Sequence, residues 1–230
     1  MFFDPLNPAD RQKNAHMLIL GPTGAGKSAS VIAMLAHVMA VHRPRLFVIE
    51  VGNSFGLLGQ WFASLGLSVN QVALKPGSGV TLSPFADAHL LLESDGPMLD
   101  TLAAASTEDD EDEPRDIMGE LEIVALLMIT GGEEREAREI RRADRSMIRR
   151  AILEAARVAH ADGRSTLTQD VREAFFTLAG QAQTDIEANK LRTMGQAIDM
   201  YTHAFNGEVF NAAGTPWQEA DGTIIDLATF

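Results

Sequence analysis

The first hundred residues alternate short apolar runs with longer helical patterns. Residues 16–20, 45–51 and 70–74 are short and apolar, and glycine, proline or polar residues bound them, which predicts three buried strands. Residues 27–40 are long and apolar enough for a buried helix between the first two. Near the end of the chain, residues 222–227 predict one more strand. Because a helix separates successive strands, we expect a mainly parallel sheet.

Residues 114–201 have a different pattern, in which apolar side chains recur every three or four positions. Four such stretches follow one another, and Gly131-Gly132 ends the first of them. No strand pattern interrupts them, which predicts an all-α subdomain. Six consecutive acidic residues, 108–113, precede these stretches. Their charges would repel one another in a packed element, so they indicate a solvated loop at the boundary.

The segment between the first predicted strand and the first predicted helix has a phosphate-binding pattern. It reads Gly21-Pro22-Thr23-Gly24-Ala25-Gly26-Lys27-Ser28, with four free residues between two glycines and then Lys-Ser. Its glycines permit backbone angles that let amide groups surround phosphate oxygens, and the helix that follows adds its positive end. The pattern and its strand–loop–helix context together predict a nucleoside triphosphate site.

Each side chain of this loop has an expected role. Lys27 would reach the β- and γ-phosphates as a catalytic residue, and the Ser28 hydroxyl would hold Mg²⁺. We therefore predict that ATP and Mg²⁺ are bound by nine residues of this segment, which are Gly21, Pro22, Thr23, Gly24, Ala25, Gly26, Lys27, Ser28 and Ala29.

The fold that follows from these patterns is α/β, with a P-loop NTPase core and an inserted helical subdomain. We expect the first part of the core over residues 1–107, an all-α helical subdomain over 108–201, and a return to the core over 202–230. The sheet should be mainly parallel.

Acidic residues at the ends of strands are candidates for the chemistry of hydrolysis. Glu50 lies at the carboxyl end of the second predicted strand, where open α/β sheets face their ligand. It is either a catalytic group or an exposed carboxylate without a role. Hydrolysis also needs an apolar strand that ends in Asp, often followed by Glu. The nearest match is Thr223-Ile224-Ile225-Asp226, which Leu227 follows. The simpler expectation is that the chain is a fragment that ends before the Asp-Glu strand, and that it is inactive alone.

Seven arginines between positions 135 and 150 fall within the second stretch of the helical region. Helical spacing would place Arg138, Arg142, Arg145 and Arg149 along one side. That side has two possible interpretations. It is a contact surface, for nucleic acid or for the nucleotide of a neighbouring subunit, or it is a solvated face whose arginines are paired with nearby carboxylates.

The composition narrows the classes of protein to which this chain can belong. A net charge of −13 argues against the whole surface binding nucleic acid, which needs a basic face. The chain has no cysteine, so it has no disulfide framework, which suits a reducing cytoplasm. No apolar run approaches the roughly 20 residues that cross a bilayer. Any membrane association is therefore expected to be peripheral and to depend on partners.

In their order along the chain, these motifs resemble those of the TraC-type conjugative-transfer ATPases of bacterial type IV secretion systems. The similarity covers the phosphate loop, Glu50-Val51-Gly52-Asn53-Ser54, and Leu82-Ser83-Pro84-Phe85, where Ser replaces the family's Asn. It extends to Thr166–Val171 and Phe205–Phe210 at the start and exit of the inserted helices, and to Thr223–Leu227. The phosphate loop is specific for nucleotide binding, whereas the order of the other motifs carries the resemblance.

The resemblance implies a cytoplasmic motor ATPase that docks at the inner membrane through a secretion channel. It also implies homo-oligomers, often hexamers, with other subunits of a secretion or conjugation machine as partners. Two other functions stay open. One is a DNA-translocating motor or coupling ATPase, for which direct DNA binding would be expected. The other is a module that binds nucleotide without hydrolysing it and uses it to order a subunit interface.

Overall fold

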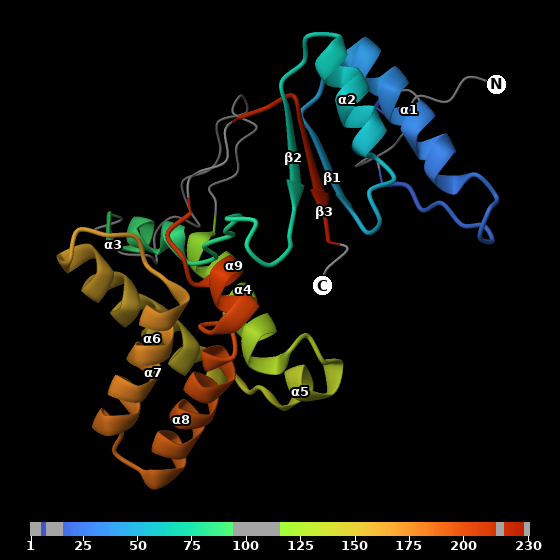
Figure 1. Ribbon diagram of the computed structural model, residues 1–230. Coiled ribbons are helices and arrows are strands. Elements are labelled where there is room, and N and C mark those ends of the chain that lie inside the picture. Colours follow the sequence, from blue (N-terminus) through green and yellow to red (C-terminus); the bar gives the residue numbers. More distant parts are fainter. Residues whose placement is uncertain (1–5, 8–15, 94–115, 215–218, 228–230) are drawn as a thin grey trace, which may run out of the picture. The chain divides into compact units, whose positions relative to one another are not determined.

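The structure is a computed structural model that describes residues 6–7, 16–93, 116–214 and 219–227 (Figure 1). The chain forms two compact units. One comprises residues 1–78 and 216–230, and we call it the α/β unit; the other comprises residues 79–215, and we call it the helical unit. The predicted acidic loop, residues 108–113, lies outside the described residues, as does the boundary expected at residue 107.

Three parallel strands form the sheet of the α/β unit. They are β1 (Leu46–Glu50), β2 (Val69–Ala73) and β3 (Gly222–Asp226), in the order β1-β3-β2. Gly222 lies opposite the first residue of both neighbours, and Asp226 lies opposite Glu50 and Ala73. The last strand of the sequence is thus the central one, because it pairs on both sides. The parallel arrangement predicted from the sequence is confirmed for these strands.

Two helices provide the apolar core of the same unit. They are α1 (Lys27–His42) and α2 (Gly56–Ser64). Met39 of α1 packs with Leu58 and Phe62 of α2, and Leu46 and Val69 of the sheet lie against this cluster. In Figure 1, α1 runs beside α2 and opposite in direction to β1.

The predicted strand over residues 16–20 is wrong. This segment has no strand conformation, and Leu18 and Leu20 are each 82% exposed. An apolar run becomes a strand only when its backbone groups find a partner strand, and among the described residues β1 and β2 are the two neighbours of β3. The hydrophobic pattern therefore located an apolar segment, but it could not show whether that segment has a partner strand.

The helical unit consists of one 3₁₀ turn and seven helices within the described residues. The turn is η1 (Ala86–His89), and the helices are α3 (Leu90–Glu93), α4 (Ile117–Thr130), α5 (Glu134–Glu139), α6 (Arg142–Ala161), α7 (Thr168–Gln181), α8 (Asp185–Asp199) and α9 (Ala204–Phe210). Helix α7 packs against both α6 and α8. Fully buried side chains, among them Phe85, Ile152 and Phe175, form one continuous core.

One predicted helix is divided. The arginine-rich stretch forms α5 and then α6, because Ile140 and Arg141 have extended backbones between them. The Arg141 amide donates to the Asp144 carboxylate at 2.9 Å, which starts a new helix in the way that a capping side chain does. Arg138 therefore lies on a different helix from Arg142, Arg145 and Arg149. The single arginine-lined side predicted from the spacing does not form.

The coarse fold prediction is confirmed as a mixed α/β protein with a small parallel sheet and a helical unit. The helical unit covers residues 79–215, compared with the predicted range of 108–201. Among the described residues, no helix combines the length and the apolar character that crossing a membrane requires.

Candidate functional site

The loop between residue 20 and α1 has a backbone that only glycine adopts easily. Gly24 and Gly26 have φ angles of +81° and +82°, in the left-handed region that a side chain disfavours. A Cβ atom added at either position would meet nothing within 4 Å. Glycine is therefore favoured at these two positions by the backbone angle, and not because a side chain would clash with a neighbour. The space beside both glycines is open to a ligand.

The amino end of α1 has the properties of an anion site. Gly26 occupies the N-cap position without any side chain bonded to the helix amides, and the first turn carries no acidic residue. The Ser30 amide makes the first helical hydrogen bond, to the Gly26 carbonyl at 2.9 Å. Amides before that bond have no helical acceptor, and the helix dipole makes this end positive. A polyanion is the complementary ligand.

Lys27 folds back over the loop. Its ammonium donates to the Gly21 carbonyl at 2.7 Å and to the Pro22 carbonyl at 2.9 Å. The Ala25 amide donates to the Pro22 carbonyl at 3.2 Å, which closes the loop. These contacts hold a cationic group, the positive end of a helix and the exposed Ser28 in one short segment. Such an arrangement can bind a phosphate chain.

Glu50 holds the turn that follows β1. Its buried carboxylate accepts hydrogen bonds from the Ser54 amide at 2.5 Å and the Phe55 amide at 2.9 Å. Phe55 is at the N-cap of α2 without a side-chain hydrogen bond of its own, and Glu50 accepts from its amide. Glu50 thus has a positioning role in the fold, while its catalytic role stays a prediction.

Asp226 lies beside Glu50 at the carboxyl end of the sheet. The two are register partners, and the Asp226 carboxylate accepts a hydrogen bond from the Gly52 amide at 3.1 Å. Both carboxylates therefore fix the turn over residues 51–55. Within the described part of the chain, no group of three or more metal-ligating side chains is assembled. Whether Asp226 serves hydrolysis stays a prediction.

The arginines of the helical unit mostly have carboxylate partners. Arg145 and Arg149 of α6 both pair with Glu122 of α4, whose side chain is 4% exposed. Arg138 pairs with Glu134, as expected for a solvated face, and Arg150 pairs with Glu187 of α8. The sequence did not reveal Glu122, because its partners lie more than twenty positions away on another helix.

Ser83 also has a role that the sequence did not predict. Its hydroxyl donates to the Ala212 carbonyl at 2.5 Å and accepts from the Gly214 amide at 2.8 Å. The adjacent Leu82 amide donates to the Val209 carbonyl at 2.7 Å. The segment around Ser83 therefore joins the beginning of the helical unit to its end, and a short serine side chain is sufficient for that purpose.

No protein-family model, curated protein or solved structure matches the chain.

Proposed function

We propose that the chain binds ATP with Mg²⁺ at Gly21–Ser28 and serves as the nucleotide-binding part of a motor ATPase with a P-loop core. The observation that carries this proposal is the Lys27 ammonium, which two loop carbonyls hold at the amino end of a 16-residue helix. This segment combines a cation, free helix amides and glycines with left-handed backbone angles. These are the groups that bind a phosphate chain.

The residues present fit such a ligand. Lys27 and the loop amides would hold the phosphates, and the Ser28 hydroxyl would provide a ligand for Mg²⁺. Bound Mg²⁺ would supply charge neutralisation for the phosphate oxygens. The open space beside Gly24 and Gly26 is consistent with a ligand that approaches the backbone closely.

The cellular role that we propose is to energise type IV secretion or conjugative DNA transfer from the cytoplasmic side of the inner membrane. The order of motifs along the chain supports this proposal, as does the combination of a parallel sheet with a helical unit between β2 and β3. Homo-oligomers, with a hexamer as the expected form, and other subunits of the secretion machine would be its partners.

A second candidate function is a module that binds nucleotide but does not hydrolyse it. Both carboxylate oxygens of Glu50 accept backbone hydrogen bonds, so this group already has a structural task. A DNA-translocating motor has less support, because Arg145 and Arg149 are paired with Glu122. Phosphate release by the purified intact protein distinguishes the first two functions, and salt-dependent DNA binding tests the third.

Replacing Lys27 tests the proposed site. Calorimetric titration with Mg²⁺-ATP should show that Lys27→Ala lowers affinity by about tenfold to a hundredfold, because charge-assisted hydrogen bonds contribute roughly 1.5–3 kcal/mol. Lys75→Ala is the matched control, since Lys75 is an exposed lysine after β2, outside the loop. Unchanged affinity in Lys27→Ala, or an equal loss in both variants, would refute the site.

A further inference from the structure

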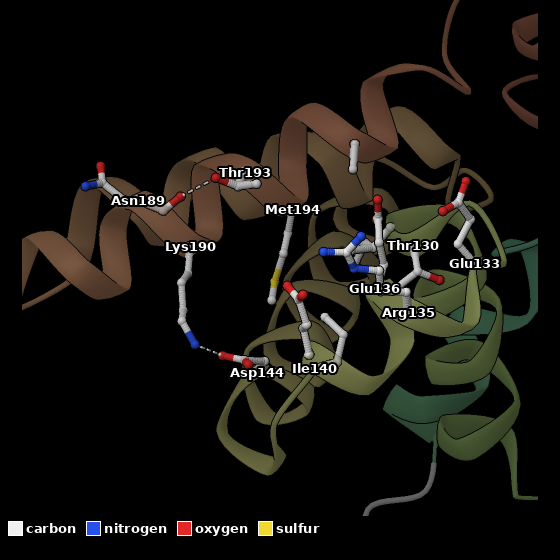
Figure 2. A pocket seen from close by; sticks show the side chains of 13 residues that line it. Thr130, Glu133, Arg135, Glu136, Ile140, Asp144, Asn189, Lys190, Thr193 and Met194 are labelled. Carbon is white, nitrogen blue, oxygen red and sulfur yellow. Dashed lines mark hydrogen bonds and ion pairs between the residues drawn. The ribbon is translucent and has the colours of Figure 1, made fainter.

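A groove of about 620 Å³ opens in the helical unit, away from the phosphate loop in sequence (Figure 2). It is lined by the end of α4, by α5, by the start of α6 and by α8. Its apolar lining comes from four side chains, which are Ile129, Ile140, Met194 and Ala197. Met194 is buried and also belongs to the core of the unit, so this part of the groove is fixed by packing.

Carboxylates surround this apolar surface. Glu133, Glu136 and Glu139 line the groove on and beside α5, and all three are exposed. Within the part of the chain that the structure describes, their carboxylates make no ion pair and no hydrogen bond. In contrast, Glu134 on the same helix is paired with Arg138. The groove thus presents three acidic groups that an incoming cation can reach.

The cations of the groove do not balance these charges. Lys190 donates to the Asp144 carboxylate at 2.6 Å, as Figure 2 shows, so its charge is neutralised inside the groove. Burial raises the pKa of Asp144, but hydrogen bonds from Lys190 and from the Arg141 amide outweigh burial and place that pKa below its usual value. Arg135 is the other cation among the lining residues. Among the described residues that line the groove, Arg135 is therefore the one cation left to balance the three glutamates.

We propose that this groove binds a basic, amphipathic helical segment of a partner protein. Apolar side chains on one face of that helix would enter between Ile140 and Met194, and its Lys or Arg side chains would meet the three glutamates. Helix-in-groove recognition uses this combination of apolar anchors and complementary charge. The acidic lining disfavours nucleic acid as the occupant. The inference concerns an interaction surface and is independent of nucleotide binding.

The proposal is tested by titrating the full chain into a fluorescein-labelled, 14-residue amphipathic peptide made of Leu and Lys, with fluorescence anisotropy as the measurement. Binding should be saturable and should weaken as salt is raised, because exposed charges are screened. Glu139→Lys should lower affinity about tenfold. Glu139 is the last residue of α5, where a cation is favourable to the helix, so this variant should fold.

Three comparisons make the result decisive. Glu93→Lys is the matched control, since Glu93 is exposed and is the last residue of the short helix α3, outside the groove. Ile140→Ser removes an apolar side chain of the groove and should also weaken binding. A peptide of Leu and Glu should gain affinity for Glu139→Lys relative to the unmodified chain. Equal losses in Glu139→Lys and Glu93→Lys, or no effect of Ile140→Ser, would overturn the proposal.

Discussion

The two units of the chain bury their apolar side chains to different extents. In the helical unit, a continuous core runs from Phe85 through Ile152 and Phe175 to Ile198. In the α/β unit, the buried cluster consists of Met39, Leu58 and Phe62, with partly buried neighbours. There, Phe47 and Ile49 of β1 are 67% and 68% exposed. The helical unit therefore has the more complete core, and the candidate chemistry belongs to the unit with the smaller one.

The difference follows from how helices and strands form the hydrogen bonds of their backbones. A helix forms its hydrogen bonds within one segment, so four or five helices can enclose a core by side-chain packing. A strand needs neighbours for its backbone and cover for both faces of a parallel sheet. Stability and ligand binding should therefore respond to different substitutions in this protein.

The largest effect on stability should come from the buried carboxylate of the helical unit. Glu122→Ala removes the partner of Arg145 and Arg149, and we expect a loss of about 2–3 kcal/mol in the free energy of unfolding. The loss is limited because both arginines are half-exposed and can be hydrated. Chemical denaturation measures it, and ATP affinity should not change.

Glu154→Ala is the control for that prediction. Glu154 lies on α6 and pairs with Arg157 three positions later, near the surface. Pairs of this kind contribute about 0–1 kcal/mol. If Glu154→Ala destabilised the chain as much as Glu122→Ala, the buried ion-pair network would not be what stabilises the helical unit.

A smaller effect on stability, but a clear effect on binding, is expected in the phosphate loop. Gly26→Ala places a Cβ on a residue with φ +82°, which should cost about 1–2 kcal/mol and turn loop amides away from the ligand. ATP affinity should therefore fall. Gly180→Ala, on an exposed position of α7, should stabilise by up to about 1 kcal/mol and leave binding unchanged. Denaturation and calorimetry together check both outcomes, and undiminished affinity in Gly26→Ala would argue against the loop geometry.

The smallest effect is expected at Thr166, before α7. Its side chain is 1% exposed, and its hydroxyl has no hydrogen-bond partner among the described residues. Thr166→Val keeps the shape and removes an unsatisfied polar atom, so it should stabilise the chain by up to about 1 kcal/mol. A raised denaturation midpoint would confirm this, whereas a lowered one would mean that the hydroxyl has a partner in solution.

Local patterns predicted the elements better than the contacts between them. The apolar spacing of α4, α7 and α8 and the glycine that ends α4 were sufficient to place those helices. The phosphate-binding pattern can be found because its residues occupy eight consecutive positions, and nucleotide binding there stays a prediction. In contrast, whether residues 16–20 find a partner strand, and which residues pair with Glu122, depends on segments distant in sequence. No local pattern contains that information.

The arginine-rich stretch shows the same limit at shorter range. Helical spacing predicted one continuous helix, but the extended Ile140 and Arg141 divide it, and Asp144 caps the second part. The capping signal was present in the sequence as an acidic residue three positions after Arg141. It was masked by the regular spacing of the arginines on both sides.

The central claim, that Gly21–Ser28 binds the phosphate chain of ATP, is tested most directly by calorimetric titration of the unmodified chain with Mg²⁺-ATP and with AMP. We predict saturable binding of Mg²⁺-ATP and at least about tenfold weaker binding of AMP, which lacks the β- and γ-phosphates that Lys27 would contact. No binding of Mg²⁺-ATP, or equal affinity for ATP and AMP, would contradict the claim.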